Sequence, residues 1–499
     1  MAHCIMIQGT MSNAGKSFIA AALCRAFVQD GYKVAPFKSQ NMALNSFITK
    51  DGFEIGRAQA MQAEAACIEP SKYMNPILLK PTTDVGSQVI VNGKAIGNMP
   101  AREYFKYKKK LIPDIMNAYN ELSKQTDIIV IEGAGSPAEI NLKSDDIVNM
   151  GLAKMLNAPV LLTGDIDRGG VFAQLYGTVM LLEKEERDLI KGIIINKFRG
   201  DKSILEPGFK MLEDRCNVPV IGALPYINVD IDDEDSLSER LEEKETKGLI
   251  DIAVIRLPKI SNFTDLNSLN RIDGISVRYV QNRNEIKEPD LIVIPGSKNT
   301  IKDMIWLRES GIESRIKKLS AKGTIVMGIC GGYQMLGIKI SDPYNTEGGG
   351  EISAMGLLDI DTVFEPEKSQ TQTEGVFEKT EGNFSFLSDL KADGYEIHMG
   401  RTVIDESSGT KSLNIKINGG TKTIGAYKNN ILGSYLHGFF DSDEISSAVS
   451  NMLFSKKGLQ ANKASIPWKE YKDMQYDKMA QNLRENIDMN YIYRIMGLI

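Results

Sequence analysis

Short, almost continuously apolar runs alternate with helical patterns along the first half of this 499-residue chain. The runs are Cys4–Gln8, Lys33–Phe37, Asp127–Ile131, Val160–Thr163 and Gly192–Asn196. A strand with one face in water alternates apolar and polar residues, whereas continuous runs indicate strands that are covered on both faces. Such strands, separated by helices, predict a parallel sheet with helices packed on its two faces.

A second series of the same kind follows an acidic stretch. Residues 230–245 read DIDDEDSLSERLEEKE, and blocks of like charge are usually exposed linkers. The strands predicted after it are Asp251–Leu257, Ile275–Val280, Leu291–Pro295 and Thr324–Ile329, and then the less regular Glu351–Val363, Tyr395–Arg401 and Gly425–Tyr435. Near the end, one helical stripe contains Met479, Ala480, Leu483 and Ile487. We predict two three-layer α/β domains with mostly parallel sheets, at residues 1–235 and 251–446, and a helical C-terminal extension at residues 447–499.

Composition restricts the partners and the compartment. The 65 acidic and 59 basic residues give a net charge of −6, which argues against nucleic acid or an anionic membrane as the main partner. No apolar run reaches the roughly 20 residues that span a bilayer, and the first residues lack the pattern of a signal peptide. The five cysteines are widely spaced and form no CxxC pair, as is typical of a reducing compartment. We therefore expect a cytoplasmic protein that acts on small molecules, in an oligomeric state that the sequence leaves open.

The first predicted strand leads through a glycine-bounded loop, GTMSNAGKS, directly into a helix. In this context the backbone N–H groups and the helix N-terminus can bind a polyphosphate, Lys16 can neutralise the phosphate oxygens, and Ser17 can ligate Mg²⁺. The loop is one residue longer than the common GxxxxGK[ST] pattern, and a plain turn is the alternative. Asn196 ends another predicted strand, where nucleotide-binding domains often read the base. The ATP-binding candidates are Gly9, Thr10, Ser12, Asn13, Gly15, Lys16, Ser17 and Asn196.

A magnesium site needs further oxygen ligands. Glu132 ends the third predicted strand, and ligands of open α/β sheets bind at the carboxyl ends of the strands. Glu132 is therefore the first choice for a second metal ligand beside Ser17, and a structural carboxylate that caps the Gly133–Gly135 turn is the alternative. Asp165 and Asp167 end the next strand and are second choices.

In the second half, a predicted strand ends in Gly328-Ile329-Cys330-Gly331-Gly332 and is followed by a helical pattern. The spacing G-x-C-x-G is the cysteine form of a nucleophile elbow, a tight turn that exposes the nucleophile between a strand and a helix. A cysteine nucleophile needs a base, and His437 at the end of a later strand is the first candidate. His398 is the reserve, either lining the site or supporting its wall. The backbone at Gly331 and at the loop containing Gly296 is expected to donate to an oxyanion.

These motifs carry a resemblance to known families. GICGGYQMLG and SYLHG are similar to class I glutamine amidotransferases, and GTMSNAGKS and IEGAGSP are similar to the dethiobiotin-synthetase-type P-loop family. Their combination in this order, with IPGSKNT and GYEIHMG, resembles the cobyrinic acid amidating enzymes. This resemblance implies an ATP-dependent synthetase domain at residues 1–235 and a glutamine amidotransferase domain at residues 251–446. The implied requirements are ATP, Mg²⁺ and glutamine as co-substrate.

Further segments resemble one branch of that family: FKSQNMALNS, EIGRAQAMQAEAA, NPILLKPTTDVGSQVIVNG, PAEINL and DIDRGGVFA. That branch amidates the b, d, e and g carboxylates of adenosylcobyrinic acid a,c-diamide in cobalamin biosynthesis, which implies a corrinoid substrate and an amide ligase. The resemblance points to Gln40, Asn41, Asn45 and Asp146 as substrate-binding residues. One alternative is a cobyrinic acid a,c-diamide synthase or another glutamine-dependent acid amidase. A different class is a regulatory partitioning-type P-loop ATPase with an inactive second domain.

Two positions depart from the family patterns. Class I amidotransferases have a His-x-Glu pair in which the glutamate orients the imidazole, but Phe439 stands two residues after His437. Related P-loop enzymes have a metal-binding aspartate where this chain has Gln40 and Asn41. We therefore expect a modest glutaminase activity that is coupled to occupancy of the synthetase site.

Overall fold

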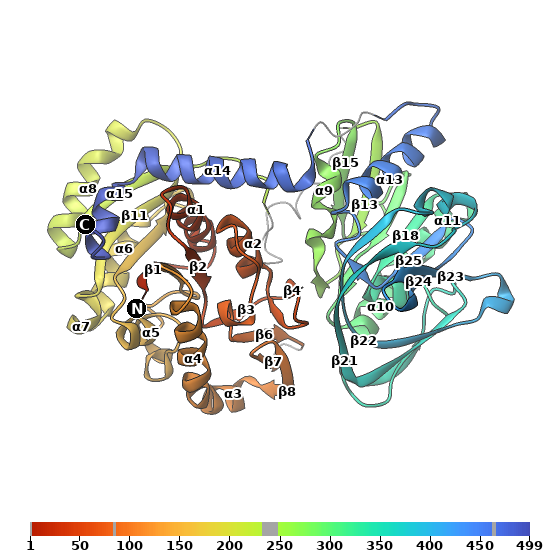
Figure 1. Ribbon diagram of the computed structural model, residues 1–499, viewed down its shortest axis with the longest axis horizontal. Coiled ribbons are helices and arrows are strands. Elements are labelled where there is room, and N and C mark those ends of the chain that lie inside the picture. The colour runs from red at the N-terminus through yellow and green to blue at the C-terminus, as the bar shows by residue number, and fades with distance from the viewer. Residues whose placement is uncertain (1, 83–85, 232–247, 462–465) are drawn as a thin grey trace.

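The computed structural model describes residues 2–82, 86–231, 248–461 and 466–499, and most of the predicted acidic linker lies outside these ranges. The chain forms two α/β units that lie side by side in Figure 1. This arrangement confirms the predicted class of two α/β units built on parallel strands, and antiparallel strands that were not predicted extend the sheet of the second unit. Among the described residues, no helix is long and apolar enough to cross a membrane.

The sheet of the first unit has six strands in the order β12-β11-β10-β1-β9-β2, and all its neighbours are parallel. These strands are β1 (His3–Gly9), β2 (Val34–Phe37), β9 (Ile128–Glu132), β10 (Val160–Asp165), β11 (Ile190–Phe198) and β12 (Val220–Pro225). The five predicted strands of the first half are confirmed, and β12 is an addition. Because β1 lies between β9 and β10, the loops after these strands meet at one edge of the sheet.

Helices cover both faces of this sheet and bury two apolar cores. One face carries α4 (Ile112–Ser123), α5 (Met150–Leu156), α6 (Val171–Leu181) and α8 (Lys202–Cys216), with the short α3 (Ala101–Tyr107) and α7 (Lys184–Arg187) nearby. The other face carries α1 (Lys16–Gln29), α2 (Arg57–Ala65), α14 (Trp468–Asn486) and α15 (Met489–Ile495). Figure 1 shows α14 running from the second unit back across the first. The predicted stripe is confirmed, because Met479, Ala480 and Leu483 are fully buried against α1 and its neighbours.

Between β2 and α3 the chain forms a small second layer that the sequence analysis does not predict. A four-stranded sheet contains β3 (Gln40–Met42), β6 (Ile77–Pro81), β7 (Gly86–Val91) and β8 (Lys94–Pro100), and β4 (Ser46–Ile48) pairs with β5 (Glu54–Gly56). This segment faces the second unit: the hydroxyl of Tyr395 donates to the carbonyl of Ser46 at 3.1 Å, and Phe47 packs edge-on against the same tyrosine ring. It therefore joins the two units.

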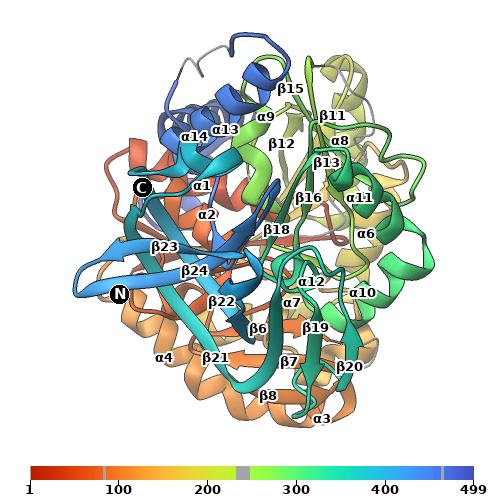
Figure 2. The same ribbon diagram turned by 90° about the vertical axis from the view of Figure 1, so that its right-hand side faces the viewer.

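The second unit has a parallel half in the order β15-β13-β16-β18-β25, continued by mainly antiparallel strands, some of which are longer. The parallel half is β13 (Ile250–Ile255), β15 (Ile275–Val280), β16 (Leu291–Ile294), β18 (Ile325–Ile329) and β25 (Ile431–Ser434). The continuation is β19 (Lys339–Asp342), β20 (Gly350–Ser353), β21 (Ile360–Phe377), β22 (Lys391–Ile404), β23 (Lys411–Ile417), β24 (Gly420–Lys428) and β26 (Leu436–His437). Figure 2 shows β19 to β24 of this set. The two-residue β14 (Ile260–Ser261) and β17 (Gly296–Ser297) pair separately.

The helices of this unit are α9 (Asn267–Asn270), α10 (Thr300–Glu309), α11 (Ile312–Ala321), α12 (Gly331–Met335) and α13 (Asp443–Lys456). Two of the less regular strand predictions are corrected. The predicted strand at 351–363 is divided between β20 and β21 by a turn in which Gly356 has a φ of 66°. The predicted strand at 425–435 is divided between β24 and β25 by a turn in which Asn429 has a φ of 53°. A left-handed residue of this kind interrupts an extended strand.

Candidate active sites

Cys330 stands at the turn between β18 and α12. Its φ of 50° and ψ of −107° are uncommon for a residue with a side chain. A side chain on Gly332 would lie 1.9 Å from the carbonyl oxygen of Ile294, so the close packing of this turn against β16 requires glycine. The thiol is nine-tenths buried and lies 3.5 Å from the carbonyl oxygen of Ile397. The strand-to-helix turn predicted from G-x-C-x-G is confirmed.

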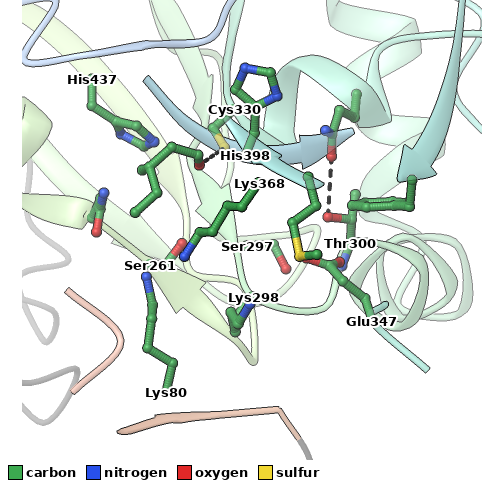
Figure 3. A pocket seen from close by; sticks show the side chains of 15 residues that line it. Lys80, Ser261, Ser297, Lys298, Thr300, Cys330, Glu347, Lys368, His398 and His437 are labelled. Atoms are coloured by element: carbon green, nitrogen blue, oxygen red, sulfur yellow. Dashed lines mark hydrogen bonds between the residues drawn. The ribbon is translucent and has the colours of Figure 1, made fainter. Parts of the chain in front are cut away.

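His437 lies on β26 and shares a pocket with Cys330, as Figure 3 shows. Its Nδ1 lies 2.7 Å from Oδ2 of Asp265, and both side chains are at least nine-tenths buried. A carboxylate only accepts hydrogen bonds, so Nδ1 carries the proton and Nε2 is left to exchange a proton with the thiol. Burial opposes a charged imidazole, but the charge and hydrogen bond of Asp265, helped by Cys330, raise the pKa of His437 well above its ordinary value.

Asp265 therefore provides the orienting carboxylate that is missing two residues after His437, where the chain has Phe439. Its other oxygen, Oδ1, accepts a hydrogen bond from the backbone N–H of Gly438 at 3.0 Å, so the aspartate holds both the ring and the chain beside it. Asp265 lies in a 3₁₀ turn, Phe263–Leu266, in the connection after β13. It precedes the histidine by 172 residues, so no local motif links the two. The available signal is its place in the loop after the first strand of the second parallel series.

The remaining candidates of the second unit lie around this pair. The Nδ1 atom of His398 lies 2.8 Å from the carbonyl oxygen of Gly400, and the ring stacks on Tyr435 with centroids 3.6 Å apart. His398 lines the pocket, and these contacts hold its ring there. Gly296 lies on β17 against β14, and a side chain on Gly331 would lie 2.8 Å from the backbone nitrogen of Ser297. The structure thus brings the two predicted oxyanion segments together beside Cys330.

The pocket has a volume of about 440 Å³, including its open mouth, and it takes residues from both units. Figure 3 shows Cys330 and His437 in its upper part, Lys80 and Lys298 in its lower part, and Lys368 between them. Lys80 belongs to β6 of the first unit. The lining residues are Lys80, Ser261, Asn262, Ser297, Lys298, Thr300, Cys330, Gln334, Glu347, Phe364, Lys368, Ile397, His398, Met399 and His437.

In the first unit, the predicted phosphate loop connects β1 to α1. Gly15 has a φ of 97°, a left-handed conformation that favours glycine, and its Cα faces the Asn196 side chain so closely that a Cβ would overlap the amide nitrogen. Lys16 curls over the loop and donates to the carbonyl oxygens of Met11 and Gly135 at 3.0 and 3.1 Å. Ser12 and Asn13 are exposed on the loop, and Thr10 donates to Gln174. The Asn196 amide donates to the carbonyl of Ala14 at 3.0 Å. In this structure Asn196 therefore holds the phosphate loop in place.

Ser17 and Glu132 lie next to each other where the magnesium site is predicted. The Ser17 hydroxyl donates to Oε1 of Glu132 at 2.8 Å, and Lys38 binds the same oxygen at the same distance. The Gly133–Gly135 turn is held instead by Asn149, which accepts from the Ala134 N–H at 3.1 Å and donates to the Ala134 carbonyl. These contacts argue against the turn-capping alternative for Glu132. The second choices are paired with cations, Asp165 with Lys197 and Asp167 with Arg199.

The four residues that the resemblance assigns to substrate binding fall in three places. Gln40 and Asn41 lie on β3, where Gln40 accepts from Tyr104 and Asn41 donates to Gln59. Asn45 is buried between the units and accepts a hydrogen bond from the N–H of Asn262 at 2.8 Å. Asn262 stands three residues before Asp265 in the chain. The carboxylate of Asp146 accepts three backbone N–H groups, those of Val148, Asn149 and Gly151, so in this structure it orders the start of α5.

Comparison with known proteins finds a matching family for each of the two units. Residues 5–239 match the CobQ/CobB/MinD/ParA nucleotide binding domain, and residues 251–445 match the CobB/CobQ-like glutamine amidotransferase domain. Over 99% of its length the chain is 60% identical to the cobyric acid synthase of Ruminiclostridium cellulolyticum, of which it covers 97%. It is 58% identical to that of Lachnoclostridium phytofermentans, with 99% of each chain covered, and 51% identical to that of Alkaliphilus metalliredigens, with 98% and 99% covered. The chain belongs to the cobyric acid synthase family.

Proposed function

We propose that the chain amidates the b, d, e and g carboxylates of adenosylcobyrinic acid a,c-diamide, using ATP and ammonia released from glutamine. The observation that carries this function is the presence, in one chain, of a phosphate loop and a Cys330–His437–Asp265 arrangement. Amidation of a carboxylate needs both sites, because the carboxylate must be activated and un-ionised ammonia is scarce near neutral pH. The alternatives of an a,c-diamide synthase and of a partitioning-type ATPase are not favoured, because the relatives are cobyric acid synthases over their full length.

Glutamine hydrolysis would proceed through Cys330. His437, held by Asp265, takes the thiol proton, and the thiolate attacks the side-chain amide carbon of glutamine. The backbone at Gly331 and Gly296 stabilises the oxyanion, and the imidazolium returns its proton to the departing nitrogen. Ammonia leaves, and water then cleaves the thioester to give glutamate and the free thiol.

Carboxylate activation would proceed at the phosphate loop. The substrate carboxylate attacks the γ-phosphorus of ATP to give an acyl phosphate and ADP, and ammonia then displaces phosphate to form the amide. Lys16 and the loop N–H groups stabilise the charge that moves between the phosphate oxygens. Mg²⁺, which prefers oxygen ligands and substrate phosphates, would neutralise part of this charge when bound, and Ser17 and Glu132 are the side chains that would hold it.

Replacing Asp265 by Asn is expected to lower kcat/KM for glutamine by roughly 10²- to 10⁴-fold, because His437 loses the charge that orients its ring. The carboxylate raises the pKa of His437, so in D265N the imidazolium that stabilises the thiolate is lost at lower pH. The alkaline limb of the glutaminase pH profile therefore moves to lower pH. Ammonia release, followed across neutral and alkaline pH, checks both effects. An unchanged profile would mean that Asp265 does not control the titration of His437.

Replacing Ser17 by Ala is expected to raise the Mg²⁺ concentration needed for half-maximal amidation by about 10- to 100-fold, because one oxygen ligand is removed. The measurement is a Mg²⁺ titration of ammonia-dependent amidation at saturating ATP. Glutamine hydrolysis by the same variant serves as the internal control, since the thiol site needs no metal. An equal loss of rate at every Mg²⁺ concentration would contradict a role as metal ligand.

The function is tested by mass spectrometry of the product. With adenosylcobyrinic acid a,c-diamide, ATP, Mg²⁺ and amide-¹⁵N glutamine, we expect four labelled amides in the product. An a,c-diamide synthase would leave this substrate unchanged and would act on cobyrinic acid instead. A regulatory ATPase would hydrolyse ATP and label neither corrinoid.

A further inference from the structure

The pocket beside Cys330 is lined by three buried lysines, Lys80, Lys298 and Lys368, which we call the lysine cluster. The exposed fraction is 5% for Lys80, 7% for Lys298 and 9% for the Lys368 side chain. Lys80 comes from the first unit, and the other two come from the second. Three ammonium groups in so small a buried volume need negative partners, because an unpaired buried charge is costly.

Residues of the first unit hold the lysine cluster in place. Oε1 of Glu54 lies 3.0 Å from Nζ of Lys80, and Oε2 lies 2.5 Å from Nζ of Lys368. Although burial opposes its charge, these two lysines keep the pKa of the Glu54 carboxyl far below its usual range. The side-chain oxygen of Gln88 accepts from Lys298 at 3.3 Å and from Lys368 at 3.4 Å.

Within the part of the chain that the structure describes, these partners do not balance the charge of the lysine cluster. Glu54 supplies one fully buried carboxylate for three lysines. Glu347 also lines the pocket beside Lys298, but burial raises its pKa to about 7, so it is only partly ionised near neutral pH. This imbalance of charge affects Lys368. Its pKa is lowered to about 7 by burial and by the neighbouring Lys80 and Lys298. Among the described residues, the pocket therefore has more lysines than carboxylates, and an anionic ligand beside Lys368 would favour its charged form.

The position of this charge matches one end of glutamine. If the side-chain amide lies at Cys330, the zwitterionic end of the amino acid extends toward the far side of the pocket. Lys298 and Cys330 line the same pocket. An α-carboxylate has the charge and the acceptor oxygens that buried ammonium groups bind best.

We propose that Lys298 and Lys368 bind the α-carboxylate of glutamine and that Glu54, Lys80 and Gln88 of the first unit position them. This inference rests on the proposed glutaminase chemistry and adds the residues that select the nitrogen donor. The glutamine pocket is then composite, because the synthetase half supplies the side chains that fix its charged end. The adjacent Glu347, when ionised, is the carboxylate that faces the α-ammonium group.

The test compares glutamine with its neutral α-amide as nitrogen donors for the full-length enzyme. Lys368→Met and Lys298→Met are each expected to raise KM for glutamine by about 10- to 100-fold, as the loss of a hydrogen bond between charged groups would do. The same variants are expected to change KM for the α-amide little, so that the preference for glutamine falls. Lys428→Met is a matched control, since Lys428 is paired with Asp359 at 2.7 Å in the same sheet and does not line the pocket.

Glu54→Gln tests the positioning role. It is expected to raise KM for glutamine without changing ammonia-dependent amidation, and Glu54→Asp is expected to restore part of the affinity. Thermal unfolding of each variant shows whether the two units remain folded.

The outcomes separate this inference from the proposed function. If KM for glutamine and for the α-amide rise equally, the lysine cluster only joins the two units and the inference is wrong. If KM is unchanged and more glutamine is hydrolysed per amide formed, the cluster serves ammonia transfer instead, and the inference is again wrong. If the unaltered enzyme forms no amide even with ammonia, the proposed function itself fails.

Discussion

Replacing Cys330 by Ala is expected to lower glutamine-dependent amidation by on the order of 10³-fold or more, while ammonia-dependent amidation continues at its normal rate. The reason is that the thiol forms the covalent intermediate, and no other group on the elbow can replace it. Cys330 lies nine-tenths buried in the pocket beside His437, whereas the phosphate loop belongs to the other unit.

The measurement supplies the C330A variant with either glutamine or an ammonium salt and follows the amidated corrinoid. Cys216→Ala is a matched control, since Cys216 is also a buried cysteine but ends α8 in the first unit. If glutamine still supports turnover, Cys330 is not the nucleophile. If both nitrogen sources fail while the variant remains folded, the elbow has a further role in the synthetase reaction.

Replacing Lys16 by Met is expected to abolish amidation and to leave glutamine hydrolysis intact, the reverse of the effect of C330A. Amidation from glutamine and from ammonia should both fall by on the order of 10³-fold, because the lysine stabilises charge on the transferred phosphoryl group. Glutamine hydrolysis should continue, because Cys330, His437 and Asp265 are untouched. Asp265 supplies the carboxylate whose absence was the reason to expect hydrolysis coupled to the synthetase site. In the structure the Lys16 ammonium already lies over the loop, bound to the carbonyl oxygens of Met11 and Gly135.

The Lys16 variant is assayed for ADP formation, for amide formation and for glutamate release. Lys124→Met provides a control, since Lys124 is an exposed lysine paired with Glu121 on the same unit. If K16M retained amidation, the phosphate loop would not be the site of carboxylate activation. Together, C330A and K16M should divide the overall reaction into two half-reactions, each of which survives when the other is lost.

Much of this organisation could be predicted from the sequence because it depends on local patterns. The buried parallel strands, the loop at Gly15 and the turn at Cys330 each follow from neighbouring residues whose spacing has a physical meaning. The predicted strands of the first sheet are confirmed, and so is the strand-to-helix turn that carries the cysteine.

The parts that could not be predicted depend on contacts between distant segments. Asp265 binds His437 although the two are 172 residues apart in the chain. The residues next to each of them give no sign of this hydrogen bond. The strands β3 to β8 are mostly short and partly polar, so their pattern does not stand out. Lys80 and Glu54 would be read as surface charges from the sequence, because the partner that Glu54 finds in the second unit, Lys368, is far away in the chain. The individual site roles stay predictions until the variants are made.

The return of α14 to the first unit affects the order in which the two units can fold while the chain is being translated. The face of the first sheet that carries α1 is completed by residues such as Met479 and Leu483, which are translated after the entire second unit. During synthesis the second unit can therefore finish folding while the phosphate-loop unit still lacks part of its apolar cover. Because domains generally fold as units while the chain emerges, the half that is made first is the last to become complete.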